Sequence, residues 1–154
     1  MPDPADPFHL QRFRDAQAGV YEGALGELRR GSKTGHWMWF IFPQLAGLGH
    51  SETARYYAIG SLEEARAYLA DPLLGPRLRA CARALLDTRE TSAEAILGPV
   101  DALKLRSSMT LFRRAAPDER VFTQVLERFY GGAPDPATDR LLDQDPPATP
   151  GAAR

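Results

Sequence analysis

The feature that most constrains the fold is a run of six large apolar side chains, residues 37–42, which contains both tryptophans of the chain. At about 25 cal/mol per Å² of apolar area, with ~150–250 Å² buried per aromatic ring, exposing this run would cost many kcal/mol. The run must therefore lie in the core or form the wall of a pocket. Because Pro43 excludes a long helix through the segment and Gly35 marks its start, we predict a short extended piece that is buried on both sides.

The ends of this run are polar. His36 precedes it and Gln44 follows it, and the indole N–H groups of Trp37 and Trp39 need acceptors if they are buried. Two interpretations are open: a core strand whose polar ends bond to the backbone, or a segment with one edge that lines a small-molecule site.

Most of the remaining sequence has helical periodicity bounded by capping motifs. The pairs Asp6-Pro7, Asp71-Pro72 and Asp135-Pro136 place proline at the first helical position after a capping residue. Ser61–Glu64 and Thr91–Glu94 are capping boxes, in which a hydroxyl and a carboxylate each accept a bond from a free backbone N–H. The expected helices cover residues 7–16, 20–30, 52–57, 62–71, 72–87, 92–97, 99–112, 117–130 and 136–142, and the first two of them are compatible with one kinked helix.

These patterns predict a mainly α fold: a single compact multi-helix domain with one long irregular aromatic-rich connection and little or no sheet. The domain is expected over residues 7–143, after a flexible segment of residues 1–6 and before a disordered Pro/Ala tail of residues 144–154. The connection covers residues 32–50. Long irregular connections inside compact domains are uncommon and are often functional.

Polar residues interrupt the apolar face of the helix expected over residues 99–112. At about 100° per residue, Asp101, Lys104 and Ser108 lie within the face formed by its large apolar side chains. A buried unpaired charge is costly, so Asp101 and Lys104 should pair, bond to the backbone or face a partly hydrated cavity. One interpretation is a helix end from which Lys104 extends to water. The other is a polar pocket in which Lys104 and Ser108, with Ser107, hold an anionic or hydroxyl-rich ligand.

Composition limits the class of partner. A net charge of −1 gives no overall field that favours nucleic acid or an anionic membrane. Nucleic-acid binding is therefore unlikely on this ground, although Arg77, Arg79 and Arg83 lie along one expected helix. No window approaches the ~18 apolar residues of a membrane span, and the acidic N-terminus differs from a signal peptide, so we expect a cytoplasmic protein. The oligomeric state is open, because the aromatic run can be either core or interface.

Neither a metal nor a cofactor is expected. The three histidines are scattered, without carboxylates or thiols at ligand spacing. The sequence has no phosphate loop, dinucleotide fingerprint or nucleophile–base pair that would define a reaction. The single cysteine, Cys81, lies in an apolar helical stripe, and we predict a buried structural thiol in a reducing compartment.

Three motifs carry a resemblance to a known family. They are GHWMWFIFPQ at residues 35–44, LGPRL at 74–78 and DALKLRSSMTLF at 101–112. Together they resemble the bacterial family catalogued as domain of unknown function 1810, over residues 7–142. The resemblance implies a mainly α-helical single domain and supplies no reaction. Some members carry a calpastatin label, but an inhibitor of that kind would be repetitive and disordered, unlike this chain.

The order of the segments also resembles a small helical family of riboside-processing proteins linked to NAD and ADP-ribose, which hydrolyse N-glycosidic bonds. Such hydrolysis needs an aromatic ring for stacking, polar groups for hydroxyls and phosphates, and a carboxylate near the oxocarbenium charge. No catalytic residue is assigned from this resemblance. The candidate ligand-binding residues of the chain are His36, Trp37, Trp39, Gln44, Asp101, Lys104, Ser107 and Ser108.

Two functions are compatible with these residues. The first is a pocket protein that acts on a nucleotide-derived or other polar small molecule, and it predicts that residues 35–44 contact the helix of Asp101. The alternative is a non-enzymatic interaction module that presents the aromatic segment to a protein partner. Two exposed indoles on a convex patch would favour the module, whereas a concave cleft with a polar edge would favour the pocket.

Overall fold

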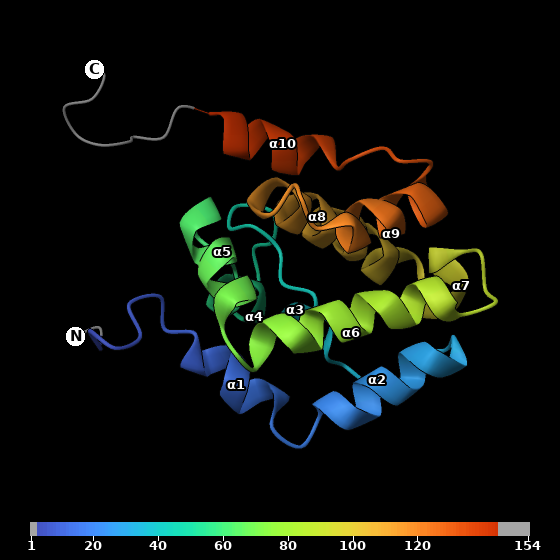
Figure 1. Ribbon diagram of the computed structural model, residues 1–154, viewed down its shortest axis with the longest axis horizontal. Coiled ribbons are helices and arrows are strands. Elements are labelled where there is room, and N and C mark those ends of the chain that lie inside the picture. Colours follow the sequence, from blue (N-terminus) through green and yellow to red (C-terminus); the bar gives the residue numbers. More distant parts are fainter. Residues whose placement is uncertain (1–2, 145–154) are drawn as a thin grey trace.

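The chain folds as an array of helices, as the sequence predicts (Figure 1). A computed structural model describes residues 3–144, so residues 1–2 of the predicted flexible segment and 145–154 of the predicted tail lie outside this range. Within it there is no sheet, and extended pairing is limited to two isolated bridges. The helices in this range are α1 (Gln11–Gln17), α2 (Tyr21–Arg30), α3 (Met38–Ile41), α4 (Glu52–Tyr56), α5 (Leu62–Ala70), α6 (Leu74–Asp87), α7 (Ala93–Leu97), α8 (Pro99–Ala115), α9 (Arg120–Tyr130) and α10 (Pro136–Asp143).

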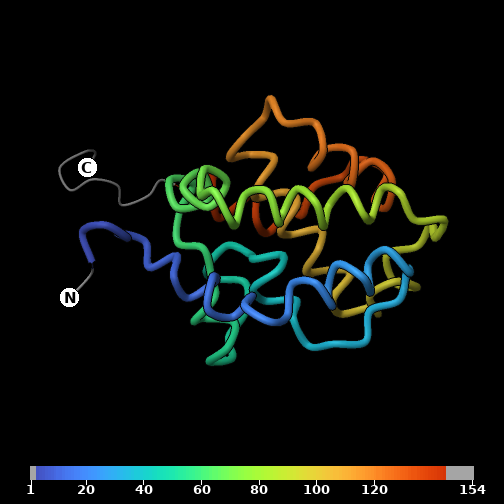
Figure 2. Tube along the Cα trace, turned by 60° about the horizontal axis from the view of Figure 1, so that its bottom comes forward, coloured from blue at the N-terminus to red at the C-terminus, as the bar shows by residue number. Residues whose placement is uncertain are grey.

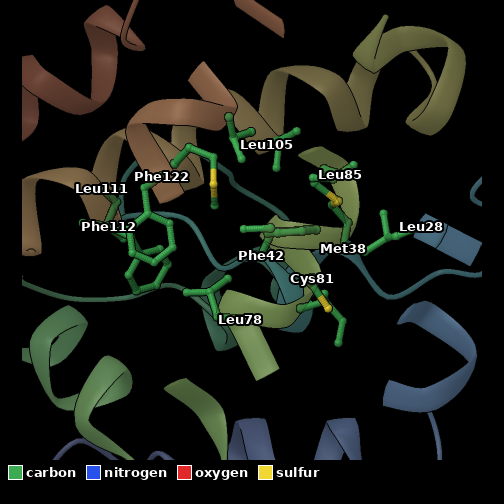
Figure 3. Packing of buried hydrophobic residues seen from close by; sticks show 14 of the residues in the cluster. Leu28, Met38, Phe42, Leu78, Cys81, Leu85, Leu105, Leu111, Phe112 and Phe122 are labelled. Atoms are coloured by element: carbon green, nitrogen blue, oxygen red, sulfur yellow. The ribbon is translucent and has the colours of Figure 1, made fainter. Parts of the chain in front are cut away.

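Helices α6 and α8 organise the core. Helix α8 packs against α5, α7, α9 and α10, and α6 packs between α2 and α9, as Figure 1 also shows. The core view in Figure 3 places Met38 and Phe42 of the aromatic run among Leu78 and Cys81 of α6. Burial raises the pKa of the Cys81 thiol to about 12, which makes it a structural thiol, as predicted.

Several predicted helix boundaries are confirmed. The Ser51 hydroxyl accepts a bond from the N–H of Ala54 at 3.0 Å, which caps α4. The Asp135 carboxylate accepts from the N–H of Thr138 at 3.0 Å, which caps α10. Helix α2 ends at Gly31, whose φ of 75° lies in the left-handed region that glycine adopts without a Cβ clash.

The prediction that a helix begins at Pro7 is wrong. The carboxylate of Asp6 accepts bonds from the N–H groups of Leu10 and Gln11, and α1 begins only at Gln11. His9 has a φ of 55°, which is incompatible with a right-handed helix through this position. Asp6 therefore caps α1 across an intervening turn. The first two helices are also separate and not one kinked helix, since residues 18–20 between them are not helical.

Both capping boxes differ from the prediction. Ser61 does cap α5, but the Glu64 carboxylate accepts from the N–H of Gly60 at 2.9 Å. The other oxygen of Glu64 pairs with an arginine of α1, which places the carboxylate one residue further back. In the second box the cap of α7 is Ser92, not Thr91. These two boxes thus locate their helix starts to within about one residue.

Helix α9 begins at Arg120, three residues later than the predicted start at Pro117. Glu119 is extended in front of it, and its carboxylate accepts bonds at 2.6 and 3.0 Å from the guanidinium of Arg79 on α6.

The aromatic run is only partly buried and is not extended: Trp37, Met38, Ile41 and Phe42 are buried, whereas Trp39 and Phe40 are partly exposed. Residues 38–41 form the single helical turn α3, in which the N–H groups of Ile41 and Phe42 bond to the carbonyls of Trp37 and Met38 at 3.1 Å. A buried extended piece would need neighbouring strands to satisfy its backbone groups. No strand lies beside the run in the described part of the chain, and a helical turn meets this requirement within the segment.

Arg12 of α1 binds the segment that contains α4. Its side chain is buried, and its Nε donates to the carbonyl of Tyr56 at 2.8 Å. Its Nη2 donates to the carbonyl of Ala58 at 2.9 Å and to the carboxylate of Glu64 at 2.7 Å. Residues 38–60 consequently lie beside α1, which is visible in both Figure 1 and Figure 2.

Candidate functional site

The carboxylate of Glu27 on α2 holds the loop that leads into the aromatic run. Its Oε1 accepts bonds from the N–H groups of Thr34 at 2.7 Å and Gly35 at 2.9 Å, and from the indole Nε1–H of Trp37 at 2.9 Å. Burial tends to raise the pKa of this carboxyl group, but these donors outweigh burial and lower the pKa to about 2. Trp37 is thus fully engaged and only 2% exposed, so it has a structural role.

A cluster of charges joins the aromatic run to α8. Asp101 lies between two ammonium groups, with 2.9 Å from its Oδ2 to Nζ of Lys33 and 3.4 Å from its Oδ1 to Nζ of Lys104. Nζ of Lys33 lies 4.9 Å from the centre of the Trp37 ring, and Nζ of Lys104 lies 4.7 Å from that of Trp39. Each tryptophan therefore carries a cation on its face. Residues 35–44 and the helix of Asp101 are in contact, as the pocket hypothesis requires.

Beside this cluster is an open cleft of about 780 Å³. One wall is the start of the aromatic run and the other is α4, so Trp39 has a lysine on one ring face and is also part of the cleft surface. Four of its lining side chains are aromatic, and the rest give it a polar edge with one cation and one carboxylate. The lining residues are His36, Trp39, Phe40, Glu52, Thr53, Arg55, Tyr56 and Tyr57.

The aromatic walls of the cleft are ordered by contacts with one another. Tyr57 packs against Phe40 with ring centres 5.4 Å apart and against Tyr56 at 4.8 Å. Burial, followed by the neighbouring Tyr56, raises the pKa of Tyr57, so its phenol remains protonated and can donate a hydrogen bond at neutral pH. The carbonyl of Phe40 accepts a bond at 2.8 Å from Gln17, which is buried. These contacts hold the aromatic walls of the cleft in place.

The other candidates lie outside the cleft. Gln44 and Trp39 border a small neighbouring recess of about 10 Å³, too small for a ligand. Ser107 lies beside the start of α10, where its hydroxyl is 3.2 Å from the carboxylate of Asp135. Ser108 is fully buried, and its hydroxyl has no partner among the described residues. The structure thus brings His36 and Trp39 into one cleft, with Asp101 and Lys104 behind Trp39.

Comparison with known sequences gives a family but no reaction. The profile of the family described as "Protein of unknown function (DUF1810)" matches residues 7–142. The chain belongs to the DUF1810 family. No curated protein matches it.

A solved structure supports the fold of this DUF1810 protein. The chain is similar to that of "the conserved hypothetical protein Rv1873 from Mycobacterium tuberculosis", with 54% sequence identity and a TM-score of 0.87. The match covers 89% of this chain and 98% of the other. The architecture is therefore shared with a protein whose description also states no activity.

Sequence reasoning missed the α4 wall of the DUF1810 cleft. Glu52, Arg55 and the adjacent tyrosines Tyr56 and Tyr57 follow a correctly predicted cap, but nothing in their spacing indicates that they meet residues 36–40. Lys33 was also missed, since its pairing with Asp101 joins positions far apart in sequence. The available signal was a pair of adjacent tyrosines at the end of a short helix, of which Tyr56 is exposed and Tyr57 partly buried, because side chains that do not fill the core are candidates for binding.

No helix in residues 3–144 combines the length and the apolar content that crossing a bilayer requires. In the same range, no three histidine, cysteine or acidic side chains are grouped so that they could hold a metal ion.

Proposed function

We infer that this protein binds a nucleotide-derived small molecule of the NAD or ADP-ribose class in the aromatic cleft. The observation that carries the proposal is a concave, aromatic surface of about 780 Å³ with a polar edge. Ligand pockets of ~300–1,000 Å³ with a few convergent polar groups are typical of small-molecule sites.

The chemistry of the lining side chains matches the parts of such a ligand. The Trp39 ring, which is held by Lys104 on one face, provides a stacking surface for a base. Arg55 is the cation of the cleft and would bind phosphate oxygens. Glu52 would accept hydrogen bonds from ribose hydroxyls, and the protonated Tyr57 would donate one to them.

Hydrolysis of an N-glycosidic bond is the reaction we propose for this ligand class. A carboxylate must stand near the developing oxocarbenium charge, and Glu52 is the carboxylate that lines the cleft. Asp101, the carboxylate among the ligand-binding candidates from the sequence, is already paired with two lysines. Nicotinamide release from NAD by the wild-type protein, lost in Glu52→Gln with binding retained, is the expected result. Binding without turnover would support a function as a binding protein and would contradict the proposed hydrolysis.

A thermal-shift panel of NAD, ADP-ribose, AMP and ribose 5-phosphate tests the binding proposal. A ligand at ~100 times its dissociation constant stabilises the fold by about 2.7 kcal/mol, which raises the midpoint by about 5–10 °C for a domain of this size. We expect Arg55→Gln to abolish the shift and Arg30→Gln, an exposed arginine outside the cleft, to keep it. No shift with any compound, or equal loss in both variants, would contradict the proposal.

A non-enzymatic interaction module is the second candidate. The observation in its favour is the exposure of Tyr56, which is 51% exposed at the rim of the cleft and can anchor a protein partner. The absence of a thermal shift with every compound of the panel would favour this function. For either function we propose a cytoplasmic location, because a single cysteine fits a reducing compartment.

A further inference from the structure

A second groove lies between α6 and the start of α9, and it shares no lining residue with the aromatic cleft. Its volume is about 650 Å³. A smaller hollow of about 180 Å³ adjoins it, shares Ala80 and Arg83 with it, and extends to Arg29 on α2. The groove lies on the α9 side of α6 and the hollow on its α2 side; the two meet at Ala80 and Arg83 and are together called the depression.

Cations outnumber carboxylates in this depression. Arg79 is neutralised by Glu119, which accepts two bonds from its guanidinium. Arg29, Arg83 and Arg120 form no ion pair within 4.0 Å with any described residue, although Asp87 lines the same hollow. Arg83 borders both parts of the depression, whereas Arg120 lines only the groove and Arg29 only the hollow. A guanidinium binds the planar oxygen pairs of phosphate better than a lysine does.

Gln124 of α9 adds an unused polar group to the groove. Its Oε1 is buried and has no hydrogen-bond partner among the described residues. A buried acceptor without a donor costs free energy, and a donor that reaches it recovers this cost. The N-terminus of α9 adjoins the groove through Arg120 and Val121, and no side chain caps it. Its free N–H groups and helix dipole also favour an anion.

We propose that this groove is a binding site for a small phosphate-bearing molecule. Arg83 and Arg120, with Arg29 at the far end, bind the phosphate oxygens, and a P–OH or alcohol group of the ligand donates to Gln124. Two linked phosphate groups supply oxygens for both groove arginines, Arg83 of α6 and Arg120 of α9. The site is independent of the aromatic cleft and does not rest on the function proposed for it.

Isothermal titration calorimetry with inorganic pyrophosphate tests this site. We expect the wild-type protein to bind one pyrophosphate, and Arg83→Gln and Arg120→Gln each to weaken binding by about tenfold or more, as loss of a charged hydrogen bond predicts. Gln124→Leu should weaken it less. Arg140→Gln, which removes the same charge from exposed α10, is the matched control and should bind as wild type does. Trp39→Phe should also bind normally, which separates this site from the cleft.

Two results would overturn the proposal. The first is the absence of pyrophosphate binding, or an equal loss of binding in Arg140→Gln and in the groove variants. Either outcome would mean that the depression is only a solvated basic surface. The other comes from a single-stranded oligonucleotide titrated at two salt concentrations. If the groove arginines were needed for the oligonucleotide but pyrophosphate did not bind, the depression would be a polyanion surface and not a small-molecule site.

Discussion

Glu27 is the residue on which the position of the aromatic run most depends. One carboxylate oxygen accepts from the backbone of Thr34 and Gly35 and from the indole of Trp37, so a single side chain of α2 fixes both the loop and the ring. A charged acceptor with three donors is stronger than a neutral one. The geometry of the loop therefore depends on the ionised form of Glu27.

This dependence predicts how stability changes with pH. The pKa of Glu27 is lowered from 4.5 to about 2 in the folded protein, so its contribution is complete above pH 4.5 and is lost as the pH falls through about 2. Urea unfolding of wild type and Glu27→Gln across this window should show a shallower pH dependence in the variant. At pH 7 the variant should lose about 1–3 kcal/mol, and exposed Glu22→Gln less than ~0.5 kcal/mol. Equal slopes for wild type and Glu27→Gln would show that this carboxylate does not anchor the loop.

The two lysines beside Asp101 are not equivalent. The Lys33 side chain is 8% exposed and also donates to the carbonyl of Gly35, whereas that of Lys104 is 23% exposed. We expect Lys33→Met to lower the free energy of unfolding by about 1–3 kcal/mol and Lys104→Met by less than ~1 kcal/mol. The midpoints of urea unfolding measure both. If Lys104→Met lowered the free energy of unfolding more than Lys33→Met does, the structural ion pair would be the one between Asp101 and Lys104.

At the scale of elements, the corner between α5 and α6 depends on the absence of a side chain. A Cβ on Gly75 would lie 2.1 Å from the backbone carbonyl oxygen of Leu69. That oxygen cannot move without displacing the end of α5, so Gly75→Ala should cost about 1–3 kcal/mol or more. Gly23→Ala is the matched control, because nothing lies within 4 Å of its Cβ and α2 should gain ~0.5–1 kcal/mol. Similar unfolding midpoints for the two variants would contradict this packing.

Local signals predict the elements better than they predict the conformation of the aromatic run. Ser51 and Asp135 cap their helices through bonds to residues three positions away, so their effect is visible in the sequence. The backbone of residues 37–42 depends instead on whether a neighbouring strand exists, and this is a property of the whole fold. Pro43 is compatible with a single helical turn before it as well as with an extended segment. Hydrophobic periodicity over so short a run does not distinguish these two conformations.

At the scale of the molecule, the cleft exists because Arg12 and Glu27 hold two irregular segments together. Arg12 ties the end of α4 to α1 and α5, and Glu27 ties residues 34–37 to α2. Sequence reasoning selected His36 and Trp39 for the cleft wall. It did not find α4 as the second wall, because no local pattern reports which segment a buried arginine will bond.

The central claim is that Trp39 forms the binding surface of the cleft. A fluorescence titration with ADP-ribose tests it most directly, because Trp37 is buried beneath Glu27 and Trp39 borders the cleft. We expect saturable quenching in the wild type, none in Trp39→Phe, and binding at least about tenfold weaker in Arg55→Gln. Quenching that persists in Trp39→Phe, or its absence from the wild type at millimolar ligand, would contradict the claim.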